Sequence, residues 1–172
     1  MLLEGRLVTL RRASVDDVDR LASILAEPDV ARHWGAFDDA EMLELVDGED
    51  EAFVVEVGGQ TIGAIQFGEV SDPMYRHATV DIFLTTAAHR QGYGSDAIRT
   101  LARYLFVERG HHRLSIDPAA DNLAAIAAYE RVGFRPIGVM RDYERGPDGT
   151  WHDGLLMDML VGELVESDVR RP

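Results

Sequence analysis

The sequence contains no cysteine, and it lacks several other features as well. Without cysteine, the chain of 172 residues has no disulfide, no thiolate metal ligand and no cysteine nucleophile. No apolar run approaches the ~18 residues that cross a bilayer. The first residues, MLLEGRLVTLRR, lack the basic and then apolar pattern of a signal peptide. These absences predict a cytoplasmic protein.

Positive charge is also scarce. The chain has 17 Lys and Arg against 31 Asp and Glu, a formal net charge of −14. Such a surface repels the phosphates of nucleic acids and anionic lipids, so we expect neither nucleic acid nor membrane as a partner. It attracts polycations such as polyamines, basic peptides and amino sugars, although acidity that serves only solubility is an equally simple interpretation.

Length and patterning predict one domain over residues 1–172. Alternating polar and apolar residues predict strands, and apolar residues at helical spacing predict helices. The expected strands cover 6–11, 52–57, 61–67, 77–84, 114–116, 134–140 and 154–161. The expected helices cover 14–25, 38–46, a segment ended by Gly110, and 122–132, with a loop over 28–35 and a frayed end, SDVRRP, at 167–172. This order predicts a mixed α/β fold that contains an antiparallel meander.

The segment HRQGYGSDA, residues 89–97, lies between an expected strand and an expected helix. Gly92 and Gly94 permit positive φ and leave backbone N–H groups uncovered by side chains. At a helix N-terminus such donors and the helix dipole attract anions, and Arg90 adds a positive charge. The segment therefore predicts a site for a pyrophosphate.

Two other interpretations of this segment stay open. Gly92, Gly94 and Ala97 also match the spacing of a Rossmann dinucleotide fingerprint. That fingerprint follows its strand at once within a βαβ unit, whereas here about seven residues intervene and a meander comes first. The other interpretation is a glycine-rich turn with no ligand.

A second motif is the helix NLAAIAAYERVGF, residues 122–134. Asn122 and Tyr129 are about two helical turns apart, so they project from one face. Taken alone, Asn122 is typical of a helix cap and Tyr129 of a core aromatic. In combination with the glycine loop, and with Gly133 and Phe134 following, the motif favours a functional role.

From Asp81 to Phe134 the chain resembles the GCN5-related N-acetyltransferase (GNAT) family. The cofactor motif of that family is Gln or Arg, two residues, Gly, one residue, then Gly or Ala; Gly92 and Gly94 match it, and His89 departs from it. The resemblance implies a twisted, mostly antiparallel sheet of about six or seven strands, helices on both faces and a splayed central strand pair. It implies acetyl-CoA as co-substrate and no metal.

The same resemblance assigns roles to residues. A bulged strand over 80–84 splays from 114–116, pantetheine lies between them, and backbone groups of Phe83 and Leu84 bind it. Tyr129 protonates the departing thiolate. The residues assigned to the cofactor are Ile82, Phe83, Leu84, His89, Arg90, Gln91, Gly92, Tyr93, Gly94, Ser95, Asn122 and Tyr129.

Two carboxylates are candidates for the general base. Asp81 lies in the middle of an apolar strand, where a carboxylate is costly unless it is used. Asp117 ends the strand 114–116, immediately before Pro118. Each either accepts the proton of the amine or pairs with an ammonium group; the alternatives are a solvent-facing strand residue for Asp81 and a turn former for Asp117.

A narrower resemblance, to the aminoglycoside 6'-N-acetyltransferases, rests on RHWGAF (32–37), IDPAADNLAAIAAYERVGF (116–134) and WHDGLLMDML (151–160). It implies a cationic amine of an antibiotic as the substrate. The residues that it assigns to substrate binding are Trp34, Asp81, Asp117 and Asp153.

Several observations leave this specificity open. That branch often carries a doubled Trp, whereas His33 precedes the single Trp34 here, and Trp34 is also typical of a buried loop anchor. Enzymes that acetylate ribosomal protein N-termini or spermidine share the layout, and a catalytically silent CoA-binding sensor is the non-enzymatic alternative. A homodimer is compatible with each of these. His111 and His112 have no partner at ligand spacing, so we expect no metal site there.

Overall fold

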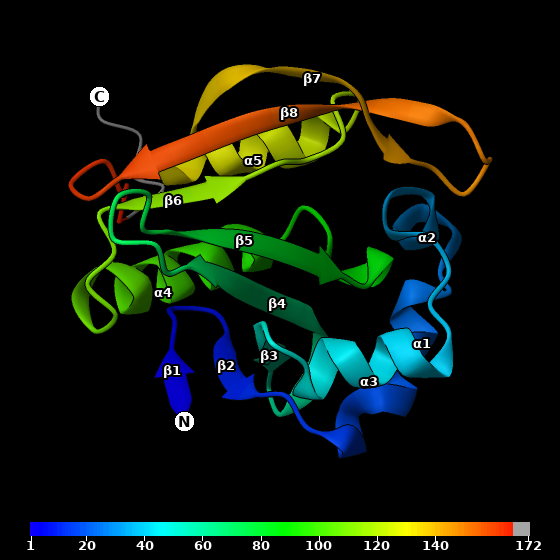
Figure 1. Ribbon diagram of the computed structural model, residues 1–172. Coiled ribbons are helices and arrows are strands. Elements are labelled where there is room, and N and C mark those ends of the chain that lie inside the picture. Colours follow the sequence, from blue (N-terminus) through cyan, green and yellow to red (C-terminus); the bar gives the residue numbers. More distant parts are fainter. Residues whose placement is uncertain (167–172) are drawn as a thin grey trace.

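The computed structural model describes residues 1–166, and the segment SDVRRP, which we expected to fray, lies outside the described residues. The described chain forms one sheet of eight strands in the order β1-β2-β3-β4-β5-β6-β8-β7 (Figure 1). The strands are β1 (Leu2–Glu4), β2 (Thr9–Arg12), β3 (Glu51–Val57), β4 (Gln60–Val70), β5 (His77–Leu84), β6 (Arg113–Ile116), β7 (Arg135–Arg145) and β8 (Trp151–Leu160). The helices are α1 (Val18–Leu25), α2 (Pro28–Trp34), α3 (Asp39–Asp47), α4 (Tyr93–Val107) and α5 (Leu123–Val132), with short 3-10 turns η1 (Val15–Asp17) and η2 (Thr86–Ala88). Within residues 1–166 the strand pairs are antiparallel except β5 with β6, so the expected mixed, mostly antiparallel sheet is confirmed, with more strands than expected.

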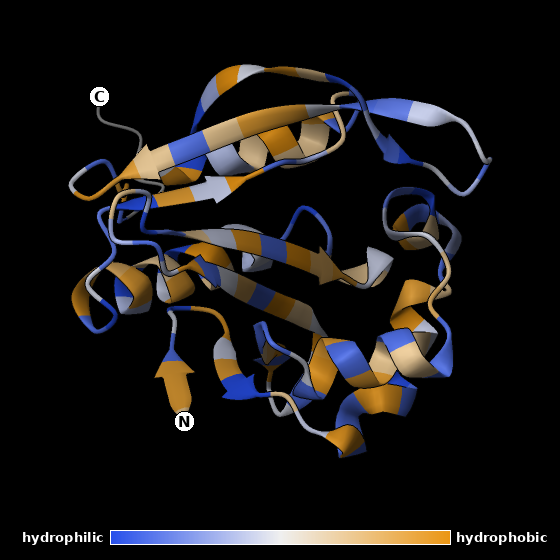
Figure 2. Cartoon of the chain, viewed as in Figure 1, coloured by the Kyte–Doolittle hydropathy of each residue, from blue (hydrophilic) through white to orange (hydrophobic). Residues whose placement is uncertain are grey.

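Alternating side chains of the central strands feed two separate cores, one on each face of the sheet. Phe53 and Val55 of β3 pack into the larger core with α4 and α5, whereas Ala52 and Val54 pack into the smaller core with α1, α2 and α3. Both sets are apolar, so the middle of β3 is buried on both faces, and Figure 2 shows orange, hydrophobic segments along the other strands of the sheet as well. The expected helices on both faces are thus confirmed. We call the two sides the α4–α5 face and the α1–α3 face.

The first fifty residues differ from expectation in two places. The strand expected over 6–11 is half of a hairpin, β1–β2, whose turn is closed by a bond from Gly5 N–H to the carbonyl of Val8 (2.8 Å). The expected loop over 28–35 contains helix α2. Pro28 starts this helix, because its fixed φ suits the first turn and its missing N–H is not needed there. Gly35, at φ 75°, ends it.

The last hairpin is longer than expected. β7 continues to Arg145 rather than 140, and β8 begins at Trp151 rather than 154. The turn between them contains Pro147, Asp148 and Gly149, residue types that favour turns. The tip of this hairpin extends toward α2 (Figure 1).

The splayed strand pair lies at the centre of the sheet and is confirmed. β5 and β6 pair only at Ala78 with Leu114 and Thr79 with Ser115. β6 then ends, while β5 continues to Leu84 beside β4, and Figure 1 shows the two strands diverging. The bulge expected in β5 is absent, because its register with β4 is unbroken. The splay therefore comes from the early end of β6 and not from a kink in β5.

Candidate active site

The glycine loop lies at the N-terminus of α4, as expected from the sequence. Gly92 is the N-cap residue and has a left-handed φ of 84°, but Gly94 is helical, so positive φ is needed at only one of the two glycines. Asp96 is the first residue of the helix whose N–H reaches a carbonyl of the helix start, that of Gly92 (3.0 Å). The amides of Tyr93, Gly94 and Ser95 therefore point out of the first turn without an intrahelical acceptor, a geometry that suits an anion.

The three residues before Gly92 have different roles. Nε2 of His89 donates to the carbonyl of Leu84 (3.1 Å), and the Gln91 amide donates to the carbonyl of Ala87 (2.7 Å), so both side chains shape the loop. Arg90 is exposed, has φ 60°, and has no hydrogen-bond or ion-pair partner among residues 1–166. Arg90 is therefore the side chain at this loop that is available to an anionic ligand.

The unpaired edge of β5 determines which main-chain groups face the splay. Thr85 N–H donates to the carbonyl of Ile62 on β4 (2.8 Å), and in an antiparallel ladder every second residue pairs in this way. The main chain of Phe83 therefore also turns to β4, and that of Ile82 and Leu84 turns to the splay. The expectation that Phe83 offers backbone groups to a cofactor is wrong. Its side chain instead packs into the core of the α1–α3 face.

Helix α5 brings the second motif to the α4–α5 face. Asn122 caps this helix, since its side-chain oxygen accepts the N–H of Ala125 (3.2 Å), while its amide group has no partner in the described chain. Tyr129 is buried, with 8% of its surface exposed, and its ring lies 6.3 Å from that of Phe134. No hydrogen bond to its hydroxyl is found within residues 1–166. Burial, and then the charges of Asp81 and Asp117, raise the pKa of Tyr129, so the phenol keeps its proton.

On the other side of the sheet, a small cavity of about 90 Å³ collects three carboxylates; we call it the inner cavity. Asp81 comes from β5, Asp117 from the end of β6, and Asp50 from the residue before β3. None of the three has an ion-pair partner in the described chain. The inner cavity is therefore an acidic site without a cation of its own.

The environment of Asp81 differs from that of an ordinary surface carboxylate. Loss of solvation in the cleft, followed by repulsion from Asp117, raises the pKa of Asp81 to about 7. The side chain still has solvent contact, so the cause is a crowded cleft and not a dry interior. Oδ1 of Asp81 accepts the N–H of Ile82 (3.0 Å) at the edge of the splay. A carboxyl group with this pKa can exchange a proton near neutral pH.

Two further residues reach the same region from β7. Tyr143 donates a hydrogen bond to Oδ2 of Asp117. That bond, more than partial burial, raises the pKa of Tyr143 to about 12. Burial and then the charge of Asp117 raise the pKa of Glu144. Asp117 is thus held by a phenol, whereas Asp81 has no side-chain donor among residues 1–166.

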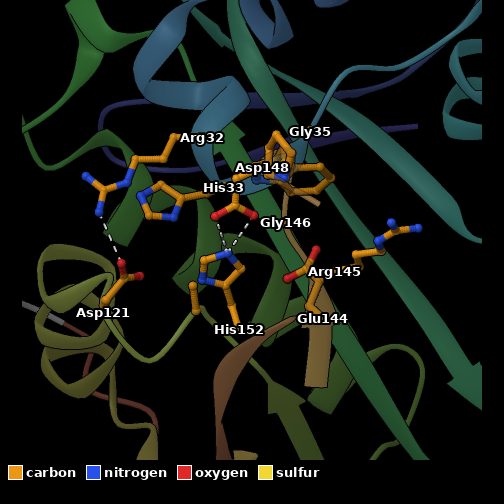
Figure 3. A pocket seen from close by; sticks show the side chains of 12 residues that line it. Arg32, His33, Gly35, Asp121, Glu144, Arg145, Gly146, Asp148 and His152 are labelled. Carbon is orange, nitrogen blue, oxygen red and sulfur yellow. Dashed lines mark hydrogen bonds and ion pairs between the residues drawn. The ribbon is translucent and has the colours of Figure 1, made fainter. Parts of the chain in front are cut away.

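A larger cavity of about 380 Å³, the outer pocket, opens between α2 and the β7–β8 hairpin (Figure 3). Its charged residues are largely paired: Arg32 bonds to Asp121 (3.1 Å) and His152 to Asp148 (3.0 Å). Trp34 lines the pocket, with its ring 4.9 Å from that of Phe83. Both interpretations of Trp34, a pocket wall and an anchor of its segment, are therefore compatible with its position.

Asp153, expected to bind substrate, does not line either cavity. Its carboxylate accepts the N–H of Asp142 (2.9 Å) and so supports the backbone of β7. Asp81 and Asp117 do line the inner cavity, and Trp34 lines the outer pocket. Three of the four residues assigned to the substrate therefore lie on the α1–α3 side of the splay.

Sequence reasoning missed Asp50, Tyr143 and Glu144. Asp50 belongs to the acidic stretch 47–51, whose composition is typical of a solvated loop, although such a stretch could also help to collect cations. Tyr143 and Glu144 lie beyond the expected end of their strand at 140. The signal that locates them is the turn sequence after Arg145, because a hairpin strand continues up to its turn.

Residues 1–166 lack two further features. No group of three His, Cys, Asp or Glu side chains in this part has a geometry suited to a metal ion. No helix in it is long and apolar enough to cross a membrane.

Together these features suit a group-transfer reaction at the splay between β5 and β6. Unpaired amides and Arg90 attract an anion at one end, and the free edge of β5 leads from there toward the carboxylates. Tyr129 approaches from one face, with a proton to donate. Asp81 approaches from the other, with the capacity to accept one.

Comparisons with known proteins agree with this geometry. Residues 7–135 match the model of the acetyltransferase (GNAT) domain. Over 99 residues the chain is 25% identical to YjcK of Bacillus subtilis (strain 168), named a probable N-acetyltransferase, and this stretch is 58% of the chain but only 54% of that relative.

Solved structures share the fold. RimL, a ribosomal L7/L12 alpha-N-protein acetyltransferase in complex with coenzyme A, superposes with a TM-score of 0.82 at 18% identity, over 94% of this chain and 98% of that one. Spermidine N-acetyltransferase from Vibrio cholerae, in complex with CoA and spermine, gives a TM-score of 0.78 at 20% identity, over 91% and 97%. These likenesses establish the fold that the sequence resemblance implied.

Proposed function

Because this chain belongs to the GNAT family and is an acetyl-CoA-dependent N-acetyltransferase, we propose that its acceptor is a primary amine of a small polycation, with an aminoglycoside as the first candidate. The observation that carries the proposal is the inner cavity, where three carboxylates gather without a cation among residues 1–166. An ammonium group of the acceptor would supply the missing positive charge. The net charge of −14 would draw such a molecule to the protein.

The residues present fit the diphosphate and the arm of acetyl-CoA. The unpaired amides of Tyr93, Gly94 and Ser95 would hold the diphosphate, with Arg90 beside them. The Ile82 N–H and the Leu84 carbonyl are already bonded to Asp81 and His89, so the carbonyl of Ile82, the N–H of Leu84 and the amide of Asn122 would bind the arm. Acetyl-CoA supplies the acetyl group as an activated thioester; the remaining chemistry is proton transfer by the protein.

Asp81 is the favoured general base. Its raised pKa means that the charged and neutral forms of the carboxyl group are both populated near pH 7, and a general base is most effective when its pKa lies near the working pH. Asp117 is already hydrogen-bonded to Tyr143, which suits it to hold an ammonium group in place. Asp81 would take the proton that makes the amine nucleophilic, and Tyr129 would give its phenolic proton to the departing sulfur.

The identity of the acceptor rests on different grounds. The aminoglycoside follows from the sequence resemblance alone. Two structural neighbours carry the names of a ribosomal protein acetyltransferase and a spermidine acetyltransferase, so a peptide N-terminus and a polyamine are the other candidates. The paired charges of the outer pocket would contact the rest of whichever molecule presents its amine to the inner cavity.

The test is thiol release from acetyl-CoA with kanamycin, tobramycin, spermidine and a peptide that starts with Ala or Ser. We expect turnover with the aminoglycosides. Turnover only with spermidine would replace the aminoglycoside by a polyamine within the proposed class, and turnover only with the peptide would refute a small polycation. Binding of acetyl-CoA without turnover of any of them would indicate a sensor.

A substitution sharpens this test. Asp50→Asn removes one carboxylate of the inner cavity, so we expect KM for the polycation to rise by roughly 5–10-fold with kcat little changed, since such a residue contributes to ground-state binding. Asp16→Asn removes one exposed acidic charge from η1 and serves as the matched control. Equal effects of the two substitutions would show that only overall charge matters.

A further inference from the structure

Strand β7 departs from regular pairing beside the active site. Met140 pairs with Gly154 and Glu144 with His152, so residues 141–143 stand opposite Asp153 alone. Within this bulge Asp142 has a left-handed φ of 48°, a conformation that L side chains rarely adopt. The bond from its N–H to the carboxylate of Asp153 stabilises the bulge (2.9 Å). The distortion is therefore supported by a side chain that has no other hydrogen-bond or ion-pair partner in the described chain.

The bulge places the Tyr143 ring against Gly154, a residue of β8 that has no side chain. A Cβ atom at Gly154 would lie 2.8 Å from Cδ1 of the Tyr143 ring and 3.1 Å from Cε of Met140. The ring therefore lies across Gly154 of β8 because this residue is glycine. From there its hydroxyl reaches Asp117, which the end of β6 supplies.

We propose that Tyr143 is a positioning residue of the acceptor site: the β7 bulge and the bare surface of Gly154 bring its phenol to Asp117, and this contact holds the Asp117 carboxylate beside Asp81. The inference rests on the proposed function and deepens it. It assigns to Tyr143, Asp153 and Gly154 the task of placing the anion that an acceptor ammonium meets.

The charged and titratable groups around Asp81 and Asp117 determine the effect of losing the contact between Tyr143 and Asp117. Asp50 faces Asp81 from the segment before β3, Tyr129 from α5, and Glu144 from β7. His33 of α2 and His152 of β8 act on Glu144, farther out. Asp117 is thus among carboxylates that repel it, and the Tyr143 hydroxyl is the side-chain donor that holds it there. Without that bond Asp117 turns toward solvent and its repulsion of Asp81 weakens.

The first test does not require turnover. The pKa of Asp81 is measured by carboxyl ¹³C NMR titration in the free enzyme and in Tyr143→Phe. We expect the pKa of Asp81 to fall by roughly 0.5–1 unit in the variant, because a nearby like charge has moved away. Tyr75→Phe, an exposed tyrosine in the β4–β5 turn, is the control for loss of a hydroxyl. An unchanged pKa of Asp81 in Tyr143→Phe overturns the inference.

The second test uses the pH profile of kcat/KM for the acceptor that turns over. We expect the acid limb of Tyr143→Phe to move to lower pH by the same roughly 0.5–1 unit. Asp117→Asn, which removes the charge outright, should move it at least as far, and the double variant no farther than Asp117→Asn alone, since both act through one contact. Gly154→Ala, which displaces the ring, should resemble Tyr143→Phe. Additive shifts would contradict the inference, whereas absence of turnover with every amine would refute the proposed function and leave the NMR result to decide on Tyr143.

Discussion

The two halves of the active site are built from different materials. On the side of the α4 N-terminus the groups that we propose as cofactor ligands are mostly main chain: amides of Tyr93 to Ser95 and the edge of β5 at Ile82 and Leu84. On the α1–α3 side they are side chains, chiefly the carboxylates of the inner cavity. The first half suits one constant ligand, because main-chain donors change little when the sequence changes. The second half can change its specificity through a few substitutions.

Tyr129 stands where the two halves meet, so its substitution should have the largest effect. In the proposed mechanism Tyr129→Phe removes the proton that the departing sulfur takes up. We expect kcat to fall by about 10²–10³-fold, the range that general acids commonly contribute. Steady-state thiol release with saturating acetyl-CoA and acceptor measures this loss.

In the proposed mechanism Tyr129 acts in catalysis and does not hold the cofactor. Calorimetry should therefore find the affinity for acetyl-CoA unchanged in Tyr129→Phe, because the ring and its contact with Phe134 remain. An unchanged kcat would show that another group protonates the sulfur. A large loss of affinity would instead place the phenol among the cofactor ligands.

The main-chain half could be predicted from the sequence to a large extent. Two glycines before a helical pattern locate the candidate anion site at the start of α4, and the spacing of Asn122 and Tyr129 places them at the N-cap and on the body of α5. These features are local, so a short window of sequence contains them. The error at Phe83 has a different origin: which side of β5 its N–H faces depends on pairing with β4, and this register cannot be read from β5 alone.

The side-chain half could be predicted only in part. Asp81 and Asp117 were found because a carboxylate in or beside an apolar strand is unusual. Asp50 and Tyr143 join them from segments far away in the sequence, and nothing local distinguishes them from solvent-exposed residues. Asp153 was placed on the substrate because its position in the motif suggested it, whereas its carboxylate bonds to the backbone of Asp142.

A second substitution tests whether the main chain alone prepares the anion site. Gly92→Ala places a side chain at φ 84°, which strains the loop. We expect the affinity for CoA, measured by calorimetry, to fall by roughly 10-fold, because the first amides of α4 lose their alignment, a loss of about 1.4 kcal/mol. Gly110→Ala imposes comparable strain at φ 67°, with no atom within 4 Å of the new Cβ, at a turn after α4. Equal losses of affinity in both variants would attribute the effect to stability and not to the site.

The smallest predicted effect concerns the loss of folding stability that the ionised carboxylate of Asp81 causes. The pKa of Asp81 is about 7 in the folded protein and about 4 in an unfolded chain. Between these values the folded state retains a proton that the unfolded state has lost, so stability decreases as pH rises through this window and the penalty is complete above about pH 7. Asp81→Asn removes the ionisation, and we expect a higher Tm than that of the wild type at pH 8, with no difference near pH 4. Because Asp81 retains solvent contact, we expect a rise of only roughly 2–4 °C, the effect of about 1 kcal/mol in a chain of this size. Asp16→Asn controls for removal of one negative charge from an acidic protein. A Tm of Asp81→Asn below that of the wild type at pH 8 would mean that the carboxylate stabilises the fold. It would then no longer follow that the side-chain half keeps Asp81 for its chemistry at a cost in stability.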